Sequence, residues 1–243
     1  GYPSATFGKG NTRFTTNTTS QVNYAESSVY YPSTGKWYLE VVVNNLNIGS
    51  GVGYLQGLTL RSSTTGSRYL WWVYASPYYQ INTESGLITI SSISNGDILQ
   101  VAYDSDTGKA WYGKNNTWYF SGDPANGTAM SNPITMAGDD VRFLIQGRSG
   151  SAANIVDVNF GAGGFAYTPP SGFKSLASRN LPDPVIKIPK KHFGTILYTG
   201  DNTDGRDVTD SSAIDFTPDW VWLKARDAGS NNFILVDSVR GAT

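Results

Sequence analysis

The sequence predicts an all-β protein built from antiparallel strands, and three observations support this. Residues 36–43 place apolar side chains on alternate positions, which is the two-residue period of a strand. Residues 95–123 contain short strand-like runs separated by turns and lack any helical period. The composition agrees, since 27 glycines, 13% aromatic residues and only 15% charged residues are typical of a turn-rich β protein.

Residues 95–123 are the stretch around which the chain is organised, and they read as a three-strand meander. Its strands are expected at residues 98–103, 109–113 and 117–120. The first turn contains Gly108, and the second consists of Asn115 and Asn116. Glycine and asparagine tolerate the positive φ angles that tight hairpin turns require, so two successive hairpins are predicted here.

Four motifs carry a family resemblance. They are Gly-Lys-Trp-Tyr-x-Glu-Val at 35–41, Gly-Asp-Ile at 96–98, Tyr-Asp-x-Asp-Thr-Gly-Lys at 103–109 and Trp-Tyr-Gly-Lys-Asn at 111–115. Together they resemble a SPRY domain, which is a concanavalin-like antiparallel β-sandwich of the jelly-roll type. The resemblance spans roughly residues 35–182 and implies the fold, but it supplies no catalytic residue.

A second set of segments resembles, more particularly, the SPRY-like part of bacteriophage tail-fibre and appendage proteins. These segments are residues 117–128, 158–161, 165–174 and 176–181. The resemblance implies a non-enzymatic virion protein that mediates host-surface attachment from the extracellular particle. It also implies a homotrimer whose further partners are other virion proteins and a host cell-surface glycan or protein.

The chain is expected to contain four regions. They are an N-terminal tether or entry strand at 1–21, the β-sandwich at 22–164, a Pro-rich strap at 165–184 with four prolines, and the start of a second β module at 185–243. In the last region strands are expected at 192–198, 220–224 and 233–237. That region is too short to close a sandwich, so we expect either truncation or completion by a neighbouring subunit.

Charge and composition exclude several functional classes. The net charge is -1 and no basic run exists, so phosphate-based nucleic-acid binding is not expected. No stretch approaches the roughly 18 apolar residues of a membrane span, so no membrane insertion is expected. The chain has no cysteine, which removes disulfides and cysteine-based metal or nucleophile sites. It begins with Gly, from which we expect a processed product or a fragment.

The catalytic and metal-ligating candidates all favour a structural interpretation. The single histidine, His192, has no accompanying nucleophile motif. Three glutamates, Glu26, Glu40 and Glu84, do not repeat at the spacing of a jelly-roll glycosidase strand, so no enzyme is expected. The turn starting at Asp104 lacks the closing Glu of a calcium loop, and the aspartates at 201–207 also read as a turn. We therefore expect no metal and no cofactor.

Aromatic residues are abundant enough for a recognition surface, with 7 Trp, 15 Tyr and 10 Phe. Sandwich modules bind through loops and strand ends, which gives five candidate ligand-binding residues: Tyr54, Tyr78, Tyr79, Trp118 and Tyr119. The alternative for each is packing in the core or at an oligomer interface. Three other functions stay open: a capsid or tail decoration protein without host contact, an accessory lectin module of a carbohydrate-active enzyme, and an intracellular SPRY adaptor.

Overall fold

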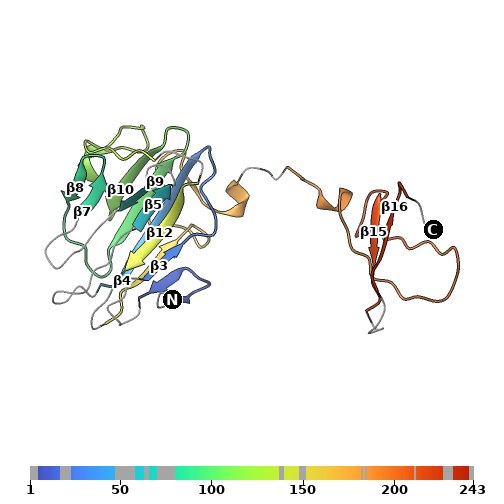
Figure 1. Ribbon diagram of the computed structural model, residues 1–243. Coiled ribbons are helices and arrows are strands. Elements are labelled where there is room, and N and C mark those ends of the chain that lie inside the picture. The colour runs from blue at the N-terminus through green and yellow to red at the C-terminus, as the bar shows by residue number, and fades with distance from the viewer. Residues whose placement is uncertain are drawn as a thin grey trace. The chain divides into compact units, whose positions relative to one another are not determined.

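The computed structural model describes residues 5–16, 23–46, 58–62, 66–69, 80–136, 140–147, 152–181, 183, 185–210, 212–226 and 232–240. The chain divides into two compact units, Gly1–Pro182 and Asp183–Thr243 (Figure 1). Every pairing between the described strands is antiparallel, except that of one short strand. The helical segments described are three 3-10 turns: η1 (Tyr119–Ser121), η2 (Ser178–Asn180) and η3 (Pro189–Lys191). The predicted all-β antiparallel class is confirmed.

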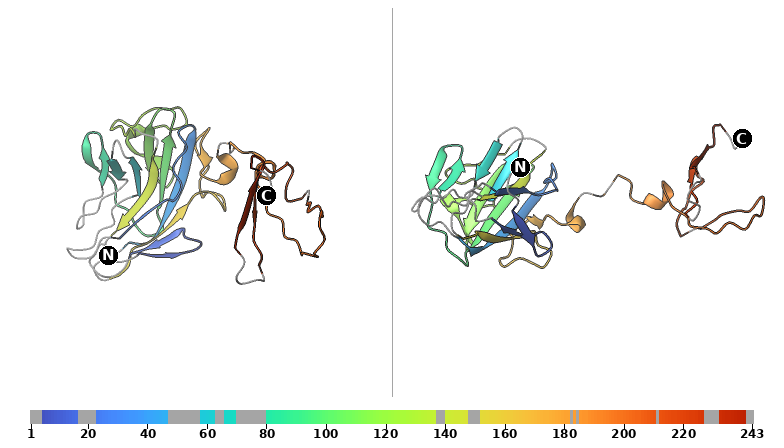
Figure 2. Two further views of the ribbon diagram at one scale, coloured as in Figure 1. Left: turned by 45° about the vertical axis from the view of Figure 1, so that its right-hand side comes forward. Right: turned by 60° about the horizontal axis from the view of Figure 1, so that its bottom comes forward.

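The first unit is built on two main sheets and a small hairpin (Figure 1, Figure 2). The larger sheet has the order β1 (Thr6–Gly8), β2 (Arg13–Thr15), β13 (Ile155–Asn159), β4 (Lys36–Asn45), β9 (Ile98–Asp104), β10 (Lys109–Lys114) and β11 (Thr117–Trp118). The smaller sheet has the order β3 (Asn23–Glu26), β12 (Arg142–Gly147), β5 (Leu58–Ser62) and β6 (Gly66–Tyr69). The hairpin pairs β7 (Gln80–Thr83) with β8 (Gly86–Thr89).

The main core lies between the two sheets. On β4 the alternate side chains of Trp37, Leu39, Val41 and Val43 are at most 3% exposed. The register sets them beside β9, with Trp37 opposite Tyr103, Leu39 opposite Val101 and Val41 opposite Leu99. The smaller sheet contributes Leu60, Phe143 and Ile145 to the same cluster. Each such burial stabilises the fold by about 1.5–3 kcal/mol, so the two-residue period seen in the sequence determines which face points inward.

The outer face of the larger sheet is buried as well, although its residues are partly polar. Tyr38, Glu40, Gln100, Ala102 and Trp111 are at most 1% exposed. Residues 160–181, which contain most of the expected Pro-rich strap and which we call the strap, contribute β14 (Lys174–Ser175) and contact Tyr38, Glu40 and Trp111 on this face. Strand β14 pairs in parallel with the start of β4, which is the exception noted above. The central strands are therefore enclosed on both faces.

Aromatic rings and one carboxylate attach the strap to the sheet. The ring of Phe165 packs edge to face on Tyr38 at 4.8 Å, and Phe173 packs on Trp111 at 6.0 Å. The Oε1 atom of Glu40 accepts hydrogen bonds from the Tyr38 hydroxyl and the Tyr167 amide, each at 2.9 Å. Its Oε2 atom accepts the Ala166 amide at 2.8 Å. A buried carboxylate is tolerated here because its oxygens are hydrogen-bonded.

The same network continues across β9. The Gln100 Nε2 atom donates to the Tyr38 hydroxyl at 2.9 Å, and Gln100 Oε1 accepts the Asn116 amide at 2.6 Å. Burial raises the pKa of Tyr38, whereas the hydrogen bond from Gln100 lowers it. The network thus connects the strap, two central strands and the β10–β11 turn.

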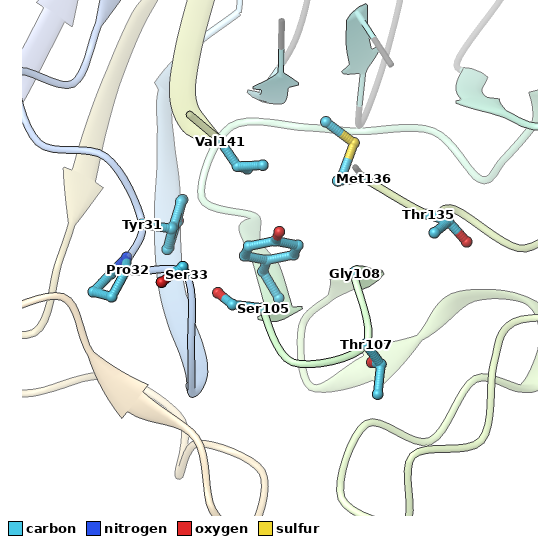
Figure 3. Close-up of a pocket in the computed structure, with 10 residues that line it drawn as sticks. Tyr31, Pro32, Ser33, Ser105, Thr107, Gly108, Thr135, Met136 and Val141 are labelled. Atoms are coloured by element: carbon cyan, nitrogen blue, oxygen red, sulfur yellow. The ribbon is translucent and has the colours of Figure 1, made fainter. Parts of the chain in front are cut away.

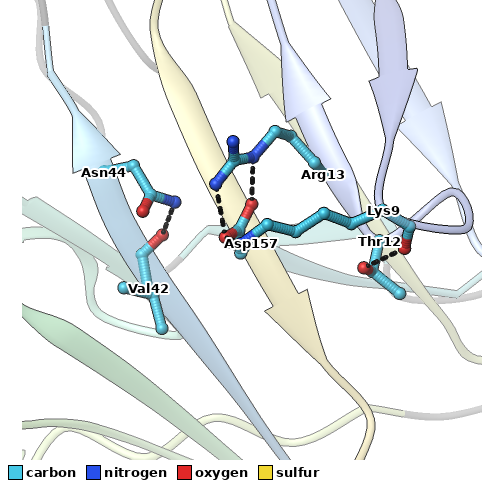
Figure 4. Close-up of polar contacts among 6 residues, drawn as sticks. All are labelled: Lys9, Thr12, Arg13, Val42, Asn44 and Asp157. Carbon is cyan, nitrogen blue, oxygen red and sulfur yellow. Dashed lines mark hydrogen bonds and ion pairs between the residues drawn. The ribbon is translucent and has the colours of Figure 1, made fainter.

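The N-terminal residues form a hairpin on the edge of the larger sheet rather than a free segment. Strand β2 pairs with β13, and Asp157 on β13 joins the two (Figure 4). Its carboxylate accepts from Arg13 Nε at 2.6 Å and Nη2 at 2.8 Å, and from Lys9 Nζ at 2.7 Å. The Arg13 hydrogen bond lowers the pKa of Asp157 to about 2, with Lys9 acting in the same direction.

In the second unit β15 (Trp220–Leu223) pairs with β16 (Ile234–Asp237). None of the described residues in this unit is buried. The side chains of Trp220, Trp222 and Phe233 are 52–56% exposed, although Trp222 and Phe233 touch edge to face at 5.0 Å. The hairpin thus presents a surface that we call the aromatic hairpin face, made of Trp220, Trp222, Phe233 and Leu235. Among the described residues, no helix has the length and apolar character to cross a bilayer.

Two expected strands differ from the observed structure. The strand predicted at 192–198 is wrong, because the amides of His192 and Phe193 donate instead to the carbonyl of Pro189 in a 3-10 turn. The third meander strand, expected to reach residue 120, stops at Trp118, since Phe120 takes a positive φ of 54°.

Candidate functional site

The first unit contains a cavity of about 290 Å³ (Figure 3). Its described lining comes from residues 31–33 after β3, from the end of β9 and the turn that follows it at 103–108, and from residues 135, 136 and 141 before β12. We call this cavity the hydroxyl cavity. Its lining comprises Tyr31, Pro32, Ser33, Tyr103, Ser105, Thr107, Gly108, Thr135, Met136 and Val141.

The 105–108 turn is held against its neighbours by backbone hydrogen bonds. Gly108 has a φ of +70°, and a Cβ there would lie 2.5 Å from the carbonyl oxygen of Met136. Only glycine fits such a position, which allows the Met136 amide to donate to the Gly108 carbonyl at 2.7 Å. On the other side the Ser105 amide donates to the Gly35 carbonyl at 2.9 Å. The wall of the cavity is therefore fixed from both sides.

The two acidic residues of this turn serve the turn itself. The Asp104 Oδ1 atom accepts the Asp106 amide at 3.0 Å, and Asp106 Oδ1 accepts the Gly35 amide at 3.1 Å. The other Asp104 oxygen lies 3.9 Å from Lys36 Nζ. Within the described ranges, no three carboxylate or histidine side chains gather closely enough to hold a metal ion.

Two tyrosines form the inner wall. Tyr31 and Tyr103 are each 3% exposed, and their rings meet edge to face at 5.4 Å. Burial raises the pKa of both phenols. Both hydroxyls therefore stay protonated at neutral pH, and each can donate and accept a hydrogen bond.

Ser105 has an unusual position beside these rings. Its Oγ atom is buried and makes no hydrogen bond of normal geometry within the described residues. It lies near the Tyr103 hydroxyl, and this proximity opposes the rise in the Tyr103 pKa, but the pair does not meet the distance and angle of a normal hydrogen bond. A buried hydroxyl without a partner is uncommon and calls for an explanation.

The lining defines what the cavity can do chemically. Six of its ten residues carry hydroxyl groups, and Pro32, Met136 and Val141 add apolar surface. No carboxylate, histidine, lysine or arginine is among these ten residues. The arrangement suits a ligand that needs hydrogen bonds and apolar contact, and it offers no general acid or base near neutral pH.

The five candidate residues from the sequence lie elsewhere. Tyr54, Tyr78 and Tyr79 lie outside the described residues. Trp118 and Tyr119 are half-buried and pack against the core, with Trp118 edge to face on Tyr38 at 6.4 Å. Burial raises the pKa of Tyr119. Neither of these two residues lines the hydroxyl cavity.

The sequence alone does not reveal the cavity residues, because they come from separate segments. Tyr31 precedes the Pro32 turn, while Ser105 and Thr107 belong to a turn that was interpreted only as a hairpin connection. A signal was present, since hydroxyl side chains follow Tyr31 and Pro32 at Ser33 and follow the expected strand 98–103 at Ser105 and Thr107. Recognising it requires knowing that those strand ends meet.

The three glutamates have separate structural partners. Glu26 pairs with Arg142 at 2.7 Å and with Arg61. The exposed Glu84 accepts the Thr135 amide at 2.8 Å, and Glu40 lies beneath the strap.

The strand pairing defines the first unit as an antiparallel β-sandwich. A family model described as a domain of unknown function (DUF7483) matches residues 188–243, which is less than half of the chain. No curated protein matches the chain.

Two solved structures illustrate what the chain is similar to. The SPRY domain of human HERC1 is 13% identical, with 64% of this chain and 91% of that chain covered and a TM-score of 0.39. A glycosyl hydrolase family protein from Mycobacterium fortuitum is 11% identical, with 60% and 74% covered and a TM-score of 0.38. Both scores lie below 0.5, so the fold assignment rests on the strand topology described above.

Proposed function

We propose that this chain is a non-enzymatic fibre or appendage protein of a bacteriophage virion that attaches the particle to the host surface. The observation that carries the proposal is the hydroxyl cavity, whose lining offers hydrogen bonds and aromatic edges without a charged group. The resemblance of residues 117–128, 158–161, 165–174 and 176–181 to phage appendage segments supports the biological setting.

The rigidity of the scaffold supports a recognition role. Strands β4, β9 and β10 are enclosed on both faces, and backbone hydrogen bonds connect the 105–108 turn to Gly35 and Met136. A wall fixed in this way loses little conformational entropy when a ligand binds. Loops on a rigid sandwich are also where such modules commonly bind.

Self-association fits the same role. A cavity of about 290 Å³ holds a small group, so a single copy is expected to bind weakly. Several copies on one particle raise the avidity without any new contact, which is consistent with the homotrimer that we propose. The exposed aromatic hairpin face of the second unit offers apolar surface for contacts with copies of this chain or with other virion proteins.

An adsorption assay tests the proposal. The purified oligomer, fluorescently labelled, is incubated with susceptible and resistant host cells, and the unlabelled oligomer is then used to compete with particle adsorption. We expect retention on susceptible cells only and a dose-dependent loss of adsorption. No retention on any susceptible host, together with normal adsorption of particles that lack residues 1–182, would instead favour a decoration protein without host contact.

A further inference from the structure

We propose that the hydroxyl cavity binds a single uncharged sugar ring, such as the terminal residue of a neutral surface glycan. This inference rests on the attachment function proposed above and names the class of ligand that the cavity takes. It depends on three properties of the lining: its size, its lack of charge and the unsatisfied hydroxyl of Ser105.

The size of the cavity restricts the ligand to one ring. Its volume of about 290 Å³ is at the lower end of the roughly 300–1,000 Å³ typical of small-molecule pockets. It lies between the two tyrosines and the 105–108 turn, whose position is fixed by the hydrogen bond from the Met136 amide to the Gly108 carbonyl at 2.7 Å. A terminal residue can enter such a site, whereas the rest of a glycan chain would remain in solvent.

The electrostatic surroundings favour a neutral ligand. None of the ten lining residues carries a charge at neutral pH. Acidic residues adjoin the lining: Asp104 and Asp106 belong to the same turn, Asp140 precedes Val141, and Glu84 accepts the Thr135 amide at 2.8 Å. Lys36 is already paired with Asp104 at 3.9 Å. A carboxylate or phosphate on the ligand would lose hydration and meet acidic neighbours, so anionic sugars are disfavoured.

The hydrogen-bonding groups match a polyhydroxylated ring. Ser105 Oγ is buried and makes no hydrogen bond of normal geometry to any described residue, and a ligand hydroxyl would supply one. The buried phenols of Tyr31 and Tyr103 remain neutral and can both donate and accept, as sugar hydroxyls do. Met136 and Val141 provide apolar contact for the C–H groups of one face of the ring.

Two substitutions test the inference without changing the shape of the lining. Ser105→Ala removes the unsatisfied hydroxyl, so it is expected to leave the stability of the fold unchanged or slightly higher. Thr107→Val removes the hydroxyl of an exposed lining residue at constant shape. Ser171→Ala is the matched control, because Ser171 is an exposed serine outside the lining.

The measurement is a titration of the full chain, followed by NMR or calorimetry, with methyl glycosides of glucose, galactose, mannose and N-acetylglucosamine. Glucuronic acid and sialic acid form the anionic arm. We expect at least one neutral glycoside to bind, with Ser105→Ala and Thr107→Val each weakening it by about threefold to tenfold, the equivalent of one hydrogen bond. Ser171→Ala should bind as the original chain does.

The outcomes separate this inference from the attachment function. If the oligomer binds host cells but the two lining variants bind equally well, the cavity is not the sugar site and the attachment function stands. Preference for the anionic sugars, or displacement of the sugar by a peptide, also overturns the inference. If neither sugars nor host cells are bound, both proposals are wrong.

Discussion

The buried carboxylate of Glu40 is the contact through which the strap can be tested most directly. Glu40→Gln keeps the size of the side chain and replaces Oε2 by an amide group. The Ala166 amide, which now donates to Oε2 at 2.8 Å, would face another donor. The bonds from the Tyr38 hydroxyl and the Tyr167 amide to Oε1 would remain, but they would lose the negative charge that strengthens them.

The expected cost follows from these three bonds. One buried amide left unsatisfied costs about 1–3 kcal/mol, and hydrogen bonds to a charged group contribute about 1.5–3 kcal/mol against 0.5–1.5 for neutral pairs. We therefore expect Glu40→Gln to lower the free energy of unfolding of the first unit by about 2–4 kcal/mol. The matched control is Glu84→Gln, an exposed glutamate with one backbone bond, for which a change within about 0.5 kcal/mol is expected.

Urea unfolding of the full chain, followed by tryptophan fluorescence, measures the cost as a shift in midpoint at constant m value. Hydrogen exchange followed by mass spectrometry locates it, because residues 160–181 should exchange faster in Glu40→Gln while β12 exchanges as before. If Glu40→Gln behaves like Glu84→Gln and exchange at Ala166 and Tyr167 is unchanged, the carboxylate does not hold the strap.

Three further perturbations address other contacts. Gly161→Ala should lower the melting temperature, because Gly161 has a φ of +89° and an added Cβ would lie 2.7 Å from the Phe165 ring; an unchanged value contradicts this packing. Asp157→Asn should destabilise the protein at pH 7. Since Arg13 lowers the folded pKa of Asp157 to about 2, this stabilisation is present above the unfolded pKa of about 3.9 and is lost as pH falls toward 2. The free energies of unfolding of the original chain and of Asp157→Asn should therefore converge as the pH falls toward 2. A difference that stays constant with pH refutes the Arg13–Asp157 ion pair. Trp222→Ser should reduce ANS fluorescence and the oligomer mass measured by light scattering, because Trp222 is 56% exposed; an unchanged mass contradicts a role in self-association.

The inner faces of the sheets could be predicted from the sequence because their period is local. Leu99, Val101 and Tyr103 alternate with other residues along one strand, and all three are buried as expected. The burial of the opposite face could not be predicted in this way. Glu40 and Gln100 look like solvent-facing positions in an alternating strand. Glu40 is buried beneath amides of the strap, and Gln100 is buried in hydrogen bonds to the Tyr38 hydroxyl and the Asn116 amide.

The hydroxyl cavity shows the same limit. Its inner wall pairs Tyr31 with Tyr103, which are far apart in the sequence, and the period of neither strand reveals that their ends meet. The expected strand at 192–198 failed for a related reason. Apolar alternation indicates a capacity to pair, but the amides of His192 and Phe193 bond to Pro189 within their own turn.

The strand order also constrains how the protein folds while it is being synthesised. Strand β2 reaches the larger sheet only through β13, and Arg13 meets Asp157 across 144 positions of sequence. Part of one edge of β4 is completed by β14, at Lys174 and Ser175. While a ribosome is still translating the segment before β13, the apolar β4 has an open edge that another nascent chain can occupy. The first unit therefore acquires its fold only after its last two strands have emerged, and β4 is the segment that most needs protection until then.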